Sequence, residues 1–156
     1  MKKVYLKGSF SNGKSFLAKR ISELYDLQLL PEYARIILQE WETDLKQIRK
    51  SISEVNEFQK ETLIRQFKEE QEVYKNGGFV APRGIDTLAF LAKHGTLLRD
   101  KSFEESVLDY GEWVKDNSIV FLVRPHKELL VDDNIRDLNY EESLEITGMV
   151  QFMLES

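Results

Sequence analysis

Gly8-Ser9-Phe10-Ser11-Asn12-Gly13-Lys14-Ser15 is the stretch from which the rest of this chain is best interpreted. It fits the pattern G-x-x-x-x-G-K-[ST] at every fixed position, and glycines there let successive backbone N–H groups point inward at phosphate oxygens. In such a loop the lysine, here Lys14, reaches the β- and γ-phosphates, and the hydroxyl of Ser15 takes one position on Mg²⁺. The sequence therefore predicts a triphosphate-binding loop.

The segments on either side of the loop have the character that such a loop requires. Val4-Tyr5-Leu6 is a short apolar, β-favouring run just before Gly8, and it predicts a buried strand. After the loop, Leu17, Ile21 and Leu24 recur at the spacing of one helix face. A strand leading into a helix whose N-terminal dipole faces the phosphates is the working context of the loop, and it disfavours the alternative of a flexible glycine turn.

Composition limits the partners and the compartment. The 156 residues have the size of one domain, and we expect a single domain over 1–156. The chain holds 27 acidic against 22 basic residues, a formal charge of −5, which disfavours a general nucleic-acid surface. It has no cysteine, no apolar stretch of membrane-spanning length and no export signal, so we expect a cytoplasmic protein.

Strands and helices alternate along the remainder of the chain. Three further strands are predicted, at 27–30 before Pro31, at 79–81 after a Gly-Gly pair, and at 119–123. The run at 119–123 is apolar throughout, which is typical of a strand covered on both faces. Capping patterns predict helices from Ser51 to about Asn76, from Ser102 to about Lys115, and after Asn139. This alternation predicts a three-layer α/β sandwich with a parallel sheet of four strands, and no fifth strand is evident.

Charged residues follow the predicted strands at positions where such sheets bind ligands. Glu32 and Arg35 lie three apart after the second strand, on one helix face. They could face the ligand crevice or form an ordinary solvated ion pair. Asp86 could act in catalysis or cap the helix that follows it, and Arg136, beside three aspartates, could be a surface arginine.

Four segments together resemble one subgroup of P-loop kinases, the ribosylnicotinamide-kinase type with its AAA-like relatives. These segments are 8–15, 31–35, 83–90 and 131–136, in the family's order. The resemblance implies the strand order 2-3-1-4 and a lid around 125–139 that closes over ATP. It implies catalytic roles for Lys14, Glu32, Asp86 and Arg136, and acceptor or phosphate contacts for Glu32, Tyr33, Arg35 and Arg83. We expect ATP to be bound by Gly8, Ser11, Asn12, Gly13, Lys14, Ser15, Phe16 and Arg124, and Mg²⁺ by Ser15.

The chain departs from the family pattern at two positions. Asn134 stands where the family tends to have glycine, a mild change because asparagine is the next-best residue for a left-handed backbone. At the end of the third strand the relatives place an aspartate that serves Mg²⁺, and this chain has Ala81-Pro82 instead. Glu32 and Asp86 are the carboxylates that could take over that task.

These observations favour an ATP- and Mg²⁺-dependent kinase that acts on a small nucleoside- or nucleotide-like acceptor. The exchange of the strand-three aspartate leaves open a nucleotide-binding regulatory or sensor module with weak or no transfer activity. A third reading is an ATPase that acts on a macromolecular partner, although no partner domain or basic patch is visible in the sequence. The identity of the acceptor and the oligomeric state are not contained in these patterns.

Overall fold

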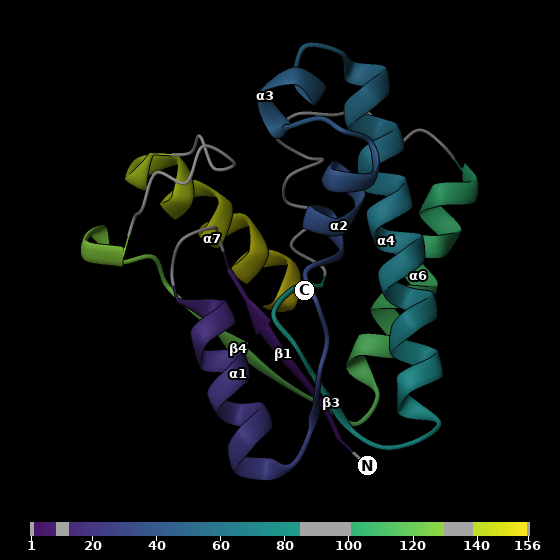
Figure 1. The fold of residues 1–156 in the computed structure, drawn as a ribbon, viewed down its shortest axis with the longest axis vertical. Coiled ribbons are helices and arrows are strands. Elements are labelled where there is room, and N and C mark those ends of the chain that lie inside the picture. The colour runs from purple at the N-terminus through teal and green to yellow at the C-terminus, as the bar shows by residue number, and fades with distance from the viewer. Residues whose placement is uncertain (1, 9–12, 85–100, 130–138, 156) are drawn as a thin grey trace.

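The computed structural model describes residues 2–8, 13–84, 101–129 and 139–155, and Figure 1 shows how their helices and strands are arranged. The elements in chain order are β1 (Lys3–Lys7), α1 (Lys14–Tyr25), β2 (Gln28–Leu29), α2 (Tyr33–Glu40), α3 (Leu45–Ile48), α4 (Ile52–Tyr74), β3 (Phe79–Ala81), α6 (Lys101–Lys115), β4 (Ser118–Leu122), the 3-10 turn η2 (Lys127–Leu129) and α7 (Tyr140–Glu155). No helix in these ranges is both long enough and apolar enough to cross a membrane.

The four strands form one parallel sheet in the order β2-β3-β1-β4, as predicted. β1 is central, because Val4 is in register with Val80 of β3 on one side and with Ile119 of β4 on the other. β2 is short and adds Gln28 opposite Phe79. Since all four strands run the same way, their carboxyl ends share one edge of the sheet.

Alternation along β1 divides the core between two helical layers (Figure 1). Val4 and Leu6 point to one face and pack with Ala18 of α1. Tyr5 points to the other face and packs with residues of α4 and α6, among them Leu63 and Phe103. The result is the predicted three-layer sandwich, in which β1 carries the start of the phosphate loop between two packed faces.

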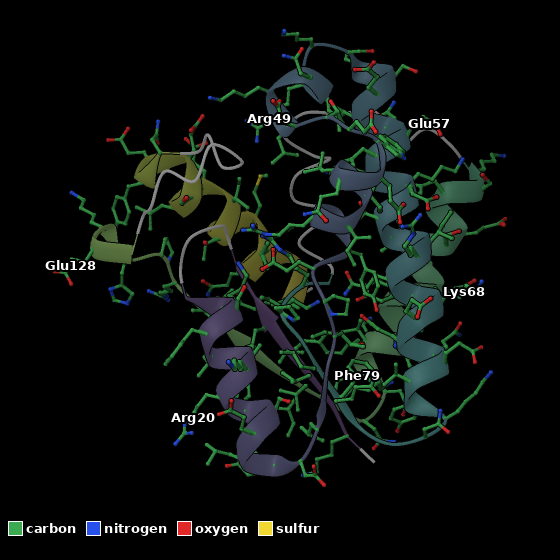
Figure 2. The ribbon with its side chains drawn as sticks, viewed as in Figure 1. Arg20, Arg49, Glu57, Lys68, Phe79 and Glu128 are labelled. Carbon is green, nitrogen blue, oxygen red and sulfur yellow. The ribbon has the colours of Figure 1, made fainter. Side chains whose placement is uncertain are left out.

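Apolar side chains fill the space between the layers, and most charged side chains project from the outside. Figure 2 shows Phe79 of β3 inside the molecule, while Arg20, Lys68 and Glu128 project from its periphery. The side chain of Phe79 is fully buried, and its ring meets the ring of Tyr5 edge to face at 5.7 Å between centroids. The strand face toward α4 and α6 is therefore closed by aromatic packing.

The outermost strand on one side of the sheet, β4, differs from its prediction. Its apolar run was expected to be covered on both faces, but Ile119, Val120 and Phe121 are 39%, 37% and 46% exposed. The expectation is wrong because β4 pairs with β1 on one side alone among the described strands, and Leu122 is its residue that packs with α7. An apolar sequence indicates a strand here without indicating how well it is covered.

The predicted apolar stripe of α1 is also only partly correct. Leu24 is 61% exposed and Leu17 is 37% exposed, whereas Ile21 packs with the sheet and Ala18 is fully buried. The small side chain of Ala18 lets the helix lie against β1, and this turns the leucines on either side toward solvent. The helix itself, Lys14–Tyr25, contains all three residues of the predicted stripe.

Candidate functional site

Several of the residues assigned to ligands from the sequence lie, within the described part of the chain, at the carboxyl edge of the sheet, where the phosphate loop begins. β1 ends at Lys7 and leads to Gly8, β2 is followed by Glu32, and β3 is followed by Arg83. β4 leads to Arg124, which is exposed, and Val123 donates to the Lys7 carbonyl at 2.8 Å, so Arg124 emerges beside the loop. One edge of the sheet thus brings together residues far apart in the sequence.

The phosphate loop passes directly into α1. Gly13 is the N-cap of the helix with φ of 81°, a left-handed conformation that side chains with a Cβ rarely adopt. Lys14 begins the helix and is almost fully buried, and its Nζ donates to the carbonyl of Gly8 at 2.9 Å. The lysine therefore bridges the two ends of the loop, with its ammonium group held where the loop closes.

Glu32 is the centre of the polar contacts at this edge. Its Oε1 accepts from the Ser15 hydroxyl at 2.5 Å, and its Oε2 accepts from Arg35 Nε at 2.9 Å. A guanidinium nitrogen of Arg83 lies 3.8 Å from the same Oε2. The Glu32 carboxylate thus contacts the phosphate loop, α2 and the turn after β3, so its pair with Arg35 is part of a larger network.

The environment of Glu32 keeps it ionised. Burial of the carboxyl by itself raises its pKa, but the Arg83 charge and the hydrogen bonds from Ser15 and Arg35 outweigh that effect and lower the pKa to about 2. The side chain of Glu32 is 12% exposed, so solvent screens these charges only weakly. At neutral pH the site holds a fixed negative charge beside the Ser15 hydroxyl.

The surroundings of Ser15 fit a magnesium ion. Mg²⁺ prefers hard oxygen ligands and retains several waters, and the Ser15 hydroxyl and the Glu32 carboxylate supply oxygens next to the loop. The end of β3 supplies none, because Ala81 and Pro82 are buried there without a carboxylate. Within the described residues no three His, Cys, Asp or Glu side chains gather as a protein-only metal cluster.

The remaining predicted residues divide into three groups. Tyr33 is buried at the start of α2, where burial, followed by the charges of Glu69 and Glu70, raises the pKa of its hydroxyl to about 12. Phe16 is 78% exposed on α1. Four predicted residues lie outside the described part of the chain: Ser11, Asn12, Asp86 and Arg136.

Sequence reasoning missed a buried polar cluster directly behind the site. Glu70 of α4 is fully buried, and Gln66, one turn earlier, donates both to Glu70 and to the carbonyl of Arg83. A signal was present in the sequence: the alternation of β1 places Lys3, Tyr5 and Lys7 on one face, and all three are fully buried. Two lysines on one face of a central strand require a buried partner such as Glu70.

Comparison with known proteins agrees with this architecture. A family model described as an AAA domain matches residues 3–156. Among solved structures, NadR protein in complex with NR is similar with a TM-score of 0.70 and 19% identity, over 99% of this chain and 42% of that one. Deoxyadenosine kinase from M. mycoides with bound dATP is similar with a TM-score of 0.58 and 15% identity, over 99% of this chain and 86% of that one.

A second NadR structure, in complex with NAD and AMP-PNP, matches with a TM-score of 0.60 and 18% identity, over 99% of this chain and 41% of that one. The chain thus spans about two fifths of the NadR chains that it matches. No curated protein sequence matches it. At these identities the structural likeness shows the fold, and the family match extends over nearly every residue; the chain therefore belongs to the AAA-domain family, with a P-loop, kinase-like fold.

Proposed function

We propose that this domain transfers the γ-phosphoryl group of ATP, with Mg²⁺, to a hydroxyl or phosphate oxygen of a small nucleoside- or nucleotide-like acceptor. The observation that carries the proposal is the set of contacts around Glu32, which joins the Ser15 hydroxyl to Arg35 and Arg83 at the open edge of the sheet. Binding of a triphosphate alone needs the loop; a carboxylate and two arginines beside it suit a second, polar substrate. Among the similar structures, NadR protein is in complex with NR or with NAD and AMP-PNP, and deoxyadenosine kinase has bound dATP.

In the transfer, an acceptor oxygen forms a bond to the γ-phosphorus while the bond from that phosphorus to the β–γ bridging oxygen breaks, so that ADP leaves. Lys14 neutralises charge on the β- and γ-phosphates, and the loop N–H groups hold them in place. Ser15 would hold Mg²⁺, with Glu32 beside it, and the ion when bound supplies positive charge to the phosphate oxygens. By the family resemblance, Arg136 would add positive charge when the lid closes, and Asp86 would lie near the phosphates or the acceptor.

Glu32 is better suited to orient the acceptor or the metal's water than to remove a proton. Both of its oxygens are already engaged, one by Ser15 and the other by Arg35 and Arg83. A carboxylate in such contacts accepts hydrogen bonds well, and phosphoryl transfer with a loose transition state needs little proton removal early on. The proton of an acceptor hydroxyl then leaves to solvent or to a product phosphate oxygen as the new bond forms.

The end of β3 supports a second candidate function, a nucleotide-responsive module with little transfer activity. Pro82 stands where the related kinases carry a magnesium-serving aspartate, and it is buried. Replacement Pro82→Asp separates the two functions. If the natural chain is catalytically impaired, the new carboxylate raises turnover at least tenfold; if turnover is already substantial and does not rise, another carboxylate serves the metal.

The direct test of the proposed function is a product screen. The protein is incubated with Mg²⁺ and ATP and a panel of ribosides, deoxyribosides and their monophosphates, products are identified by mass spectrometry, and ATP binding is measured on the same sample. A product heavier by one phosphoryl group names the acceptor and supports the kinase. Binding of ATP without any phosphorylated product contradicts the kinase and favours the nucleotide-responsive module.

A further inference from the structure

A buried hydrogen-bond cluster lies between α4, α6 and the sheet, centred on the carboxylate of Glu70. Tyr5 Oη donates to Glu70 Oε2 at 2.6 Å, and Trp113 Nε1 donates to the same oxygen at 3.0 Å. Gln66 Nε2 and Tyr110 Oη donate to Oε1 at 2.7 and 2.9 Å. Four donors from three elements thus use the four acceptor positions of one carboxylate, and we refer to these five residues as the Glu70 cluster.

Charge also holds Glu70 in this position. Lys3 and Lys7 are fully buried on the same strand face as Tyr5, and each interacts electrostatically with Glu70. The pKa of the Glu70 carboxyl is raised overall, because burial outweighs the Tyr5 hydrogen bond and the Lys7 charge, which lower it. A buried carboxylate with this many partners is costly to move, so it fixes the groups that it contacts.

The cluster reaches the functional site at the turn after β3. The amide of Gln66 has two hydrogens, and its two shortest contacts are Glu70 Oε1 at 2.7 Å and the carbonyl of Arg83 at 2.8 Å. The side chain of Gln66 is 3% exposed, so water does not compete for either contact. The main chain of Arg83 is therefore tied to α4 through one amide group.

A second contact acts on the next residue of the same turn. Gly84 has no Cβ, and a Cβ built there would meet the Tyr110 hydroxyl at 2.9 Å and the end of the Lys7 side chain. Lys7 directly precedes Gly8, the first residue of the phosphate loop. Tyr110 of the Glu70 cluster and the neighbouring Lys7 thus lie against the turn, and Lys7 leads directly into the start of the loop.

We propose that Gln66 and Glu70 are positioning residues, which hold the turn at Arg83–Gly84 so that the Arg83 guanidinium faces Glu32 and the triphosphate site. The chain of contacts runs from Glu70 through Gln66 to the Arg83 main chain, then from the Arg83 side chain to Glu32 at 3.8 Å, and from Glu32 to Ser15. The expected effect of Gln66 on nucleotide affinity rests on the proposed function. The geometric part of the claim stands apart from that function.

If Gln66 only stabilised the core, another buried glutamine of α4 would behave in the same way when replaced. Gln59 provides this control. Gln59 lies two turns before Gln66 on the same helix and is 5% exposed. Replacement of either glutamine by methionine keeps the approximate volume and removes the amide. Both variants should lose stability because a buried amide is removed, whereas only Gln66→Met removes the hydrogen bond to the Arg83 carbonyl.

The first measurement needs no nucleotide. Hydrogen exchange of the Arg83 Nε–H group is followed by NMR in the wild type and both variants under native conditions, with global stability measured by urea unfolding. Arg83 Nε is buried, so its N–H exchanges only when the turn opens. Because Gln66→Met removes the hydrogen bond to the Arg83 carbonyl, we expect the turn to open, and this N–H to exchange, roughly tenfold faster than in Gln59→Met. Equal exchange in the two variants would overturn the positioning role.

The second measurement is the affinity for AMP-PNP with Mg²⁺, determined by isothermal titration calorimetry in a double-mutant cycle of Gln66→Met and Arg83→Met. Gln66→Met is expected to weaken binding by roughly three- to tenfold, with Gln59→Met close to wild type. Because Gln66 acts through Arg83, the double variant should bind no more weakly than Arg83→Met alone. If Gln66→Met weakened AMP-PNP binding as much in the Arg83→Met background as in the wild type, the proposal would be contradicted.

The two measurements separate the two claims. If the wild type fails to bind AMP-PNP with Mg²⁺, the proposed function falls, and the exchange of Arg83 Nε–H still decides whether Gln66 positions the turn. If AMP-PNP binds and Gln66→Met changes neither the exchange nor the affinity, the proposed function stands and the positioning role falls.

Discussion

Single residues at the carboxyl edge of the sheet have roles that depend on contacts with several elements at once. Glu32 is the clearest case, since a carboxylate after β2 meets a hydroxyl of the phosphate loop and two arginines from separate segments. Its contact with Arg35 is predictable from their i,i+3 spacing in the sequence. Its contacts with Ser15 and Arg83 follow from the strand order, which brings the ends of β1, β2 and β3 together.

Replacement Glu32→Gln should make the stability difference from the wild type depend on pH. The folded-state pKa of about 2 lies below the ordinary 4.5, so the ionised carboxyl stabilises the fold above pH 4.5, and this contribution disappears as the pH falls toward 2. The difference in free energy of unfolding should be about 3 kcal/mol near pH 7 and shrink steadily below pH 4.5. Urea unfolding from pH 7 to pH 3 measures it, and a difference that stays constant over this range would refute the account of Glu32.

Two glycines that look alike in the sequence should respond oppositely to alanine. A Cβ at Gly84 would overlap the buried Lys7 side chain and lie 2.9 Å from the Tyr110 hydroxyl, so Gly84→Ala should cost about 1–3 kcal/mol. Gly111 lies inside α6 with nothing within 4 Å of its Cβ position, so Gly111→Ala should stabilise by about 0.5–1 kcal/mol. Urea unfolding of both variants decides, and changes of the same sign would show that the turn at Gly84 is not tightly packed.

Secondary-structure elements were predicted best where a local signal marks their ends. Ser51 accepts from the Glu54 N–H at the start of α4, and Asn139 and Glu142 bond each other's N–H groups at the start of α7, as their spacing predicts. The burial of β4 was not predictable, because an apolar run records the preference for a strand and not the number of neighbours. The Glu70 cluster was not predictable either, because its shortest hydrogen bond joins Tyr5 and Glu70, which are 65 positions apart in the sequence.

The two capping patterns should differ in strength. Asn139 Oδ1 accepts at 2.9 Å and Glu142 returns a hydrogen bond at 2.9 Å, while the Ser51 cap is long at 3.4 Å and shows one bond. Asn139→Ala should therefore cost about 1–2 kcal/mol, and Ser51→Ala about 0.5 kcal/mol. Equilibrium unfolding in urea compares them, and a larger loss for Ser51→Ala would contradict the ranking by hydrogen-bond distance.

At the scale of the whole molecule, the sheet converts sequence order into a site. Its parallel strands end at one edge, one helical layer carries the loop helix α1, and the other layer anchors the turn after β3 through α4 and α6 (Figure 1). The fold class was predictable because local patterns mark strands and helices in alternation, and the phosphate loop because its motif is local. The strand order was predictable only from the family resemblance. The acceptor was not predictable, because its contacts come from side chains that only tertiary structure brings together.

The transfer of a labelled γ-phosphate from ATP tests the proposed kinase most directly. The wild type and Lys14→Ala are incubated with Mg²⁺, γ-labelled ATP and the acceptor panel, with circular dichroism to verify that both are folded. The account predicts label on an acceptor with the wild type and a loss of at least about a hundredfold with Lys14→Ala, because the lysine charge acts on the transferring group. Equal transfer by both proteins, or label found only in free phosphate, would contradict the account.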